Sequence, residues 1–155
     1  MLVGGTSPNP NSVNYRCTQQ VVIESEMDGL VVRLDPASGR LQMAARAEAD
    51  PWQVWLVTAS AGLASTQFTS LASGRLLSLW GLSDWRLGPE NSGGFVTIAA
   101  AGGLVYDTAR LEPVAWTRGW AGAEVGQRLR VWNLVGNKNQ RFKLVPAGAL
   151  QGQPA

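Results

Sequence analysis

Trp52-Gln53-Val54-Trp55-Leu56-Val57 decides the fold, because loosely similar segments recur twice further along the chain. The copies are Gly94-Phe95-Val96-Thr97-Ile98 and Asn139-Gln140-Arg141-Phe142-Lys143-Leu144-Val145. The aromatic anchors of the three segments, Trp55, Phe95 and Phe142, are 40 and 47 residues apart. A repeat of about 20 to 50 residues indicates one supersecondary unit used several times, in which no copy buries its apolar face alone. We therefore expect three similar units.

Short apolar segments separated by turn residues make up each unit. In Asp35-Pro36-Ala37-Ser38-Gly39, proline presets φ and glycine accepts positive φ, so this segment predicts a tight turn. No stretch shows sustained helical periodicity, and 18 glycines and 8 prolines disfavour long helices. The pattern predicts an all-β barrel or sandwich. The expected strands are 20–24, 29–34, 40–45 and 52–58, then 66–71, 75–80, 84–88 and 94–99, then 103–108, 112–117, 127–133 and 140–145.

The two ends of the chain differ in composition from its body. Residues 1–18 are rich in Gly, Pro, Asn and Ser, and we expect them to form an extended arm. Residues 147–155 are similar and predict a flexible or partner-held tail. Residues 19–146 then form a single domain, which suits a chain of 155 residues with 45% hydrophobic residues.

Several classes of protein are excluded by what the chain lacks. It has no histidine and one cysteine, Cys17, so we expect no disulfide within the chain, no metal site and no cofactor. The Ser-His and Cys-His nucleophile pairs are absent for the same reason. The acidic residues have no spacing that places two of them together for glycoside cleavage; they include Glu24, Glu26, Asp50, Asp84 and Glu124. We therefore expect no enzyme.

Charge and hydropathy argue against two further kinds of partner. The net charge is only +2 and the basic residues are scattered, so we expect no nucleic-acid binding. No apolar run approaches the roughly eighteen residues that span a bilayer. Met1-Leu2-Val3-Gly4-Gly5-Thr6-Ser7-Pro8 lacks the pattern of a secretory signal. These features leave the location open between the cytoplasm and a virion or other assembly.

The first unit resembles one unit of a β-trefoil. The resemblance lies in Val22-Ile23-Glu24-Ser25, Gly29-Leu30-Val31-Val32-Arg33-Leu34-Asp35, Gly39-Arg40-Leu41-Gln42-Met43 and Trp52-Gln53-Val54-Trp55. The step Gln53-Val54-Trp55, repeated as Gln140-Arg141-Phe142, is similar to the repeat signature of ricin-B-type lectins. The resemblance covers residues 20–146, although the middle copy lacks the glutamine.

This resemblance implies three four-stranded units in a closed six-stranded barrel capped by three hairpins. It places Trp55, Phe95 and Phe142 at equivalent interior positions around a pseudo-threefold axis. A closed barrel has no unpaired edge strand, which supports the same shape on physical grounds. We therefore expect all three aromatic side chains in the core.

The resemblance also implies a sugar site in the third unit. Lectins of this type combine a carboxylate, an aromatic platform and amide contacts, which suit the hydroxyls and the C–H face of a pyranose. The matching residues are Asp107 for the carboxylate, Trp132 for the platform, and Asn139 and Gln140 for the amides. The other units carry Arg33 and Ser78 in place of Asp107, so we expect one site at most.

Each of these residues also has a structural interpretation. Asp107 would cap a turn through its own backbone, and Trp132 would point into the core. Gln140 would brace a loop with hydrogen bonds, and Asn139 would be an ordinary turn residue. These alternatives remain open at the level of the sequence.

Tryptophan is more frequent than the fold requires, with seven in the chain. Trp80 and Trp116 are expected in the cores of the capping hairpins. Trp85 and Trp120, beside glycine-containing turns, are expected to be exposed and to form a recognition surface.

Two functions of different classes fit these observations. The first is a non-enzymatic, lectin-like module that recognises a glycan. The second is a structural or interaction subunit of a larger assembly, such as a virion accessory or decoration protein. It would use both arms to contact other protein subunits and form an oligomer.

Overall fold

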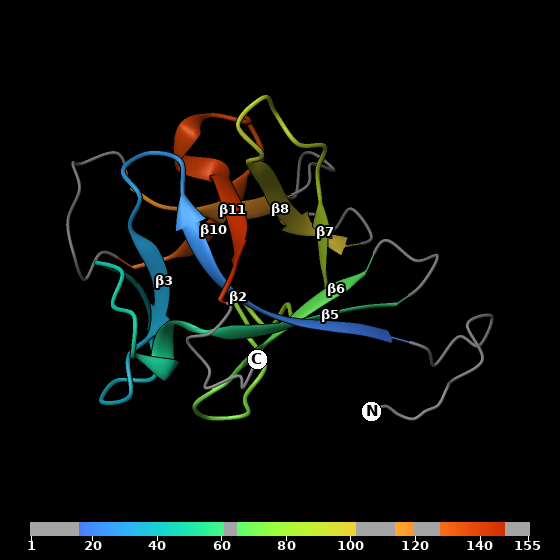
Figure 1. Cartoon of the computed structure of the whole chain (residues 1–155). Helices are drawn as coiled ribbons and strands as arrows, with labels where there is room; N and C mark the ends of the chain where they lie inside the picture. Colours follow the sequence, from blue (N-terminus) through green and yellow to red (C-terminus); the bar gives the residue numbers. More distant parts are fainter. Residues whose placement is uncertain (1–15, 61–64, 102–113, 120–127, 148–155) are drawn as a thin grey trace.

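The computed structural model describes residues 16–60, 65–101, 114–119 and 128–147 (Figure 1). These residues contain a ten-stranded sheet and two short 3-10 helices, η1 (Pro51–Gln53) and η3 (Lys138–Gln140). The all-β class is therefore confirmed. The strands are β2 (Arg16–Ser25), β3 (Val31–Leu34), β4 (Leu41–Ala44), β5 (Trp55–Ser60), β6 (Thr66–Ser70), β7 (Trp85–Leu87), β8 (Val96–Ala100), β9 (Val114–Thr117), β10 (Arg130–Asn133) and β11 (Arg141–Pro146).

The antiparallel strands form a closed circuit. Strand β2 pairs with β5, and β5, β6, β7 and β8 then pair in succession. Strand β11 completes the circuit, because it pairs with both β8 and β2. Phe142 on β11 lies opposite Val96 on one side and Ser25 on the other. The expected closed barrel is thus confirmed among the described residues.

The remaining strands extend from this barrel as hairpins. Strands β3 and β4 pair with each other, and β3 joins the circuit where Val31 lies opposite Glu24. Strands β9 and β10 pair in the same way, with Val131 opposite Trp116. This hairpin lies in the third unit, where a site is expected.

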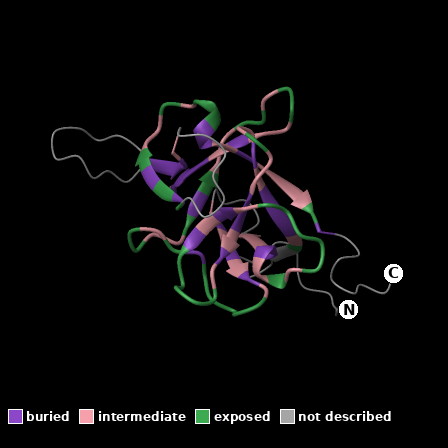
Figure 2. Cartoon of the chain, turned by 90° about the vertical axis from the view of Figure 1, so that its left-hand side faces the viewer, coloured by how far each residue is buried: buried purple, intermediate pink, exposed green. Residues whose placement is uncertain are grey.

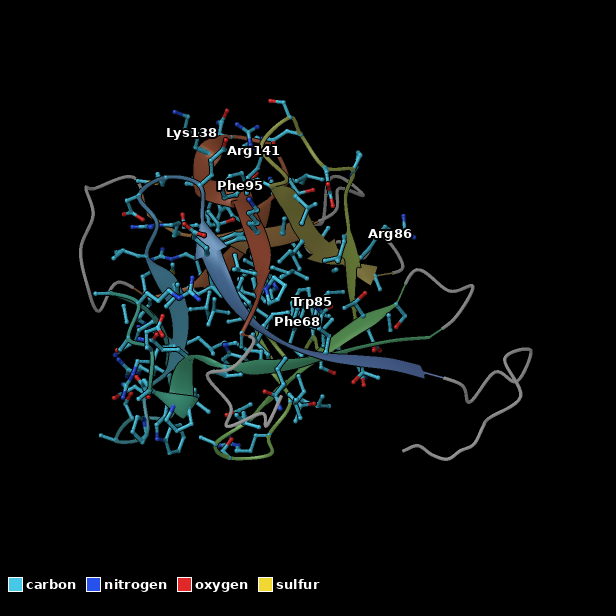
Figure 3. The ribbon with its side chains drawn as sticks, viewed as in Figure 1. Phe68, Trp85, Arg86, Phe95, Lys138 and Arg141 are labelled. Carbon is cyan, nitrogen blue, oxygen red and sulfur yellow. The ribbon has the colours of Figure 1, made fainter. Side chains whose placement is uncertain are left out.

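Aromatic side chains fill the centre of the barrel. Trp116 contacts three other rings, those of Phe68, Trp85 and Phe142, at centroid distances of 5.1, 5.6 and 5.8 Å. Its planes with Trp85 and Phe142 are inclined by 81° and 71°, an edge-to-face arrangement that aromatic pairs favour. Trp55 belongs to the same buried cluster. Phe68 and Trp85 are labelled at this centre in Figure 3, and Figure 2 shows exposed residues concentrated on the loops.

The expectation that Phe95 lies in the core is wrong. Strand β8 begins one residue later, and its alternation turns Val96, Ile98 and Ala100 inward. Phe95 is only half-buried, and its ring lies under the Lys143 ammonium group at 5.5 Å (Figure 3). At the equivalent position of the core, the second unit therefore has Val96, whereas the first and third units have Trp55 and Phe142.

Two strand boundaries also differ from expectation. Strand β2 begins at Arg16, opposite Ser60, so residues 16–18 belong to the sheet and not to the arm. Residues 75–80 form no regular strand and make only isolated bridges, Thr69 to Leu76 and Leu79 to Leu82. The expected strand 103–108 lies outside the described residues.

The turn expected at residues 35–39 is confirmed. The Gly39 amide donates to the Asp35 carbonyl at 2.7 Å, and Gly39 has a φ of 75°. The Asp35 carboxylate accepts from the Ser38 hydroxyl at 2.6 Å and from the Ser38 amide at 3.0 Å. These bonds, led by the hydroxyl, hold the pKa of the Asp35 carboxyl below its ordinary value because they favour the charged form.

The contrast between Phe142 and Phe95 is testable by substitution. Phe142→Ala should lower the free energy of unfolding by about 3 to 5 kcal/mol, because it removes a fully buried ring and leaves a cavity. Phe95→Ala should cost about 1 kcal/mol, because less apolar area leaves water on folding. Chemical denaturation of both variants measures the difference, and equal losses would contradict the assignment of Val96 to the core.

Candidate functional site

Strand β10 displays Trp132 on the outside of the barrel. The strand alternates, so Leu129 and Val131 are buried while Arg130 and Trp132 face solvent. The Trp132 side chain is 60% exposed. The alternative in which Trp132 points into the core is therefore wrong, and an indole is available as a platform.

Gln140 is a brace. Its side-chain oxygen accepts from the Val135 and Gly136 amides, both at 2.8 Å. Its side-chain nitrogen donates to the Asn133 carbonyl at 2.8 Å and to the Thr117 hydroxyl at 3.0 Å. These four bonds use the full capacity of the amide, and the residue is 1% exposed.

Gln53 has the same role in the first unit. It accepts from the Ala47 amide and donates to the Ala45 carbonyl, both at 2.8 Å. The glutamine of the repeated step thus ties each 3-10 helix to the loop before it. The structural interpretation of this signature residue holds in both units that carry it.

Asn139 is the buried amide next to this brace. Its nitrogen donates to the Arg118 carbonyl at 3.0 Å, and the Arg118 amide donates back to the Asn139 carbonyl at 3.0 Å. The side-chain oxygen of Asn139 is buried and has no hydrogen-bond partner among the described residues. A buried acceptor without a donor is unfavourable by about 1 to 3 kcal/mol, so this oxygen is a candidate to receive a ligand hydroxyl.

A cavity of about 430 Å³ brings these residues together. This volume falls within the range of about 300 to 1,000 Å³ that is typical of small-molecule sites. The described residues that line it are Thr117, Arg118, Gly119, Arg130, Trp132, Val135, Asn139 and Gln140. Three of the four predicted site residues thus meet at one cavity. Asp107 lies outside the described residues, as does Trp120.

The walls of this cavity are held by two ion pairs. The Arg118 guanidinium, which is fully buried, contacts the Asp28 carboxylate at 2.5 Å. Arg141, labelled in Figure 3, contacts Glu26 at 2.5 Å and donates to the Gly136 carbonyl at 2.5 Å. Sequence reasoning missed Arg118, because its partner is 90 residues away and only the barrel brings them together.

The exposure of Trp80 and Trp85 is the reverse of what the sequence predicted. Trp85, expected on the surface, is fully buried against Trp116, because β7 turns it toward the barrel axis. It does not form a recognition surface. Trp80, expected in a hairpin core, is 59% exposed because it sits at the tip of a tight turn. Trp116 is buried, as expected.

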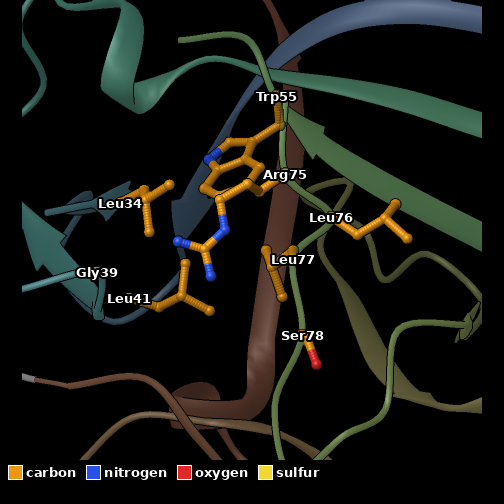
Figure 4. Close-up of a pocket in the computed structure, with 8 residues that line it drawn as sticks. All are labelled: Leu34, Gly39, Leu41, Trp55, Arg75, Leu76, Leu77 and Ser78. Carbon is orange, nitrogen blue, oxygen red and sulfur yellow. The ribbon is translucent and has the colours of Figure 1, made fainter. Parts of the chain in front are cut away.

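A separate, smaller hollow is shown in Figure 4. Leu34, Leu41 and Leu77 line it together with Trp55, and the Arg75 side chain extends between them. Its volume is about 70 Å³, far below that of a typical ligand site. This hollow is therefore too small for a sugar.

Comparison with known proteins rests on structure alone. No protein-family model and no curated protein matches the chain. The Rhizoctonia solani agglutinin is 12% identical, with a TM-score of 0.67 over 84% of this chain and 96% of that one. ThreeFoil, a designed threefold-symmetric protein, is 16% identical, with a TM-score of 0.63 over 81% of this chain and 97% of that one. The fold is a β-trefoil.

Two other solved structures are similar to this fold. The C-half of the earthworm R-type lectin, solved in complex with GalNAc, is 16% identical, with a TM-score of 0.51 over 83% of this chain and 98% of that one. An exo-β-1,3-galactanase from Clostridium thermocellum is 16% identical, with a TM-score of 0.65 over 83% of this chain but 30% of that one. At such identities the β-trefoil likeness establishes the fold alone.

Two features are absent from the part of the β-trefoil that the structure describes. Within the described segments, no helix has the length and apolar character needed to cross a bilayer. Among the same residues, no group of three or more His, Cys, Asp or Glu side chains is placed to bind a metal ion.

Removing the hydrogen bonds of the Gln140 side chain should destabilise the loop that forms one wall of the cavity. Gln140→Leu leaves the Val135 and Gly136 amides without their acceptor, so we expect a loss of about 1 to 3 kcal/mol of stability. Gln19→Leu, at an exposed position of β2, is the matched control and should change stability little. Equilibrium denaturation compares the two, and equal stability would argue against the bracing role.

Proposed function

We propose that this β-trefoil is a non-catalytic, lectin-like module that binds carbohydrate in the cavity of the third unit. One observation carries the proposal: an exposed indole, Trp132, lines the same cavity as Asn139, whose buried oxygen has no partner among the described residues. The similarity of the fold to an agglutinin and to an R-type lectin supports it.

The chemistry of a pyranose matches these two groups. Its C–H face packs on an indole ring, which supplies a large rigid apolar surface. A sugar hydroxyl directed at the Asn139 oxygen would satisfy that acceptor and recover the cost of its burial. Asp107 is the proposed carboxylate, which would accept bonds from adjacent hydroxyls. Gln140 acts through the loop that it braces, because its own amide bonds are all used by the protein.

Binding without catalysis is the form that we propose. Glycoside cleavage ordinarily requires two carboxyl groups about 5 to 9.5 Å apart across the scissile bond. The described residues that line the cavity include no Asp or Glu. Asp28, which is not among these lining residues, forms an ion pair with Arg118. Asp107 alone would then bind and orient a sugar.

Loss of the platform should abolish binding without unfolding the protein. Trp132→Ala removes an exposed ring, so we expect an unchanged thermal melt and no signal on a glycan array; Asp107→Ala should behave in the same way. A single sugar site binds weakly, with a dissociation constant near 1 mM or about 4 kcal/mol, so the array should be multivalent. Leu76→Ala, at another exposed apolar side chain, is the control that keeps binding. Undiminished binding by Trp132→Ala would refute the site.

The alternative function, a subunit of a larger assembly such as a virion, makes a different prediction. It requires that removal of residues 1–15 prevents oligomerisation and that neither version of the chain binds a glycan. The lectin proposal requires that both versions bind the same glycans. Analytical ultracentrifugation together with the array separates the two, and a glycan-silent chain that oligomerises through the arm would support the alternative.

A further inference from the structure

A second cavity, of about 470 Å³, adjoins the first. Its walls come from two units: Ser78, Leu79 and Trp80 from the second, and residues 128–132 from the third. Arg130 and Trp132 line both cavities. A ligand that is longer than one sugar residue would therefore extend past Trp132 from one cavity into the other.

Trp80 lines this second cavity from a strained backbone conformation. Leu79 and Leu82 exchange backbone hydrogen bonds of 3.0 and 2.9 Å across a two-residue turn. Trp80 has a φ of 57° and Gly81 a φ of 76°, so both central residues are left-handed. Such turns favour Asn, Asp or Gly, because a bulky side chain at positive φ is strained. The strained backbone and the exposure of the indole together make Trp80 a candidate to contact a ligand.

Two arginines give the second cavity a positive charge. Arg128 and Arg130 are exposed and alternate with the buried residues Leu129 and Val131, so they project to the same side. Neither forms an ion pair with a described residue, and no Asp or Glu is among the described residues of the wall. Arg118 and Arg141, in contrast, are each paired with an acid.

We infer that the second cavity is a subsite for an acidic sugar residue, one that carries a carboxylate or a sulfate. This inference rests on the proposed function, since the neighbouring residue of the same oligosaccharide would occupy the cavity of Trp132 and Asn139. The acidic ring packs on Trp80, and its anionic group is bound by Arg128 and Arg130. Arginine suits this role because its planar guanidinium donates two parallel hydrogen bonds to a carboxylate or sulfate.

A glycan fits this surface better than a nucleic acid does. Single-stranded nucleic acids also stack on aromatic rings, but their binding proteins carry a basic groove that follows several phosphates. Here two arginines converge on one cavity, and the chain has a net charge of only +2. One anionic group beside one apolar ring is the ligand that these side chains recognise.

The first experiment is an array in which each acidic oligosaccharide stands beside its neutral parent. Uronates are paired with their carboxyl-reduced forms, and sulfated sugars with their desulfated forms, so the two sources of charge are separate arms. We expect one arm to bind the full chain about tenfold or more tightly than its neutral parents. Raising the salt from about 50 mM to about 500 mM should remove much of this preference.

Substitution of arginines tests which residues cause the preference for acidic glycans. Arg128→Gln combined with Arg130→Gln should reduce the acidic preference to near unity. Arg86→Gln, at an exposed arginine of β7 (Figure 3), is the matched control and should keep it. An acidic preference that survives the double variant would overturn the inference.

Trp80→Asn separates binding from stability. Asparagine suits the left-handed position, so the melting temperature should stay the same or rise, while affinity for the acidic glycan falls about tenfold. A lowered melting temperature with unchanged affinity would show that Trp80 is structural, and the inference would fail.

The outcomes distinguish this inference from the proposal on which it rests. Binding to neutral glycans that depends on Trp132, without any acidic preference, would overturn the acidic subsite and leave the lectin function intact. If the chain bound no glycan, both the acidic subsite and the lectin function would be overturned. A fifteen-nucleotide oligothymidylate that binds as tightly as the best acidic glycan would replace the subsite with a general polyanion surface.

Discussion

The pairing of β11 with both β2 and β8 is the constraint on which the rest of the structure depends. It closes the circuit of strands and leaves none of these three at an open edge of the barrel. The same pairing sets the register that places Phe142 opposite Val96 and against Trp116. Because η3 leads directly into β11, closure of the barrel also positions Asn139 and Gln140.

The repeated glutamine shows how one residue serves both the fold and the site. Gln140 holds the loop of Val135 and Gly136 to Thr117 at the end of β9. The neighbouring Asn139 is tied to Arg118, which is in turn held by Asp28. The wall of the cavity is therefore a network of hydrogen bonds between segments from different parts of the chain. Such a network would fix the geometry of the proposed sugar site before a ligand binds, which reduces the entropic cost of binding.

Three local features of the second and third units work against stability. Trp80 occupies a left-handed turn position, the Asn139 oxygen is buried without a donor, and Arg128 and Arg130 face one cavity without an acid. In the first unit, in contrast, Asp35 and Gly39 form a regular turn, and the Gln53 amide is hydrogen-bonded at both its oxygen and its nitrogen. Departures from local consistency that gather on one surface are typical of a binding region. These features line the two cavities that share Trp132, between the second and third units.

The amino-acid sequence, with its resemblance to a β-trefoil, predicted the all-β class, the closed barrel and the proximity of Trp132, Asn139 and Gln140 in the third unit. Strand alternation and turn residues act over a few positions, so β4, β6 and the turn at residues 35–39 are readable locally, and the glutamine step reveals the repeat. The tertiary structure decided which aromatic side chains face inward. A shift of one residue in the start of β8 moved Phe95 out and Val96 in, because successive strand residues point to opposite faces. It likewise buried Trp85, exposed Trp80 and paired Arg118 with Asp28, since these outcomes depend on contacts between units that no local pattern records.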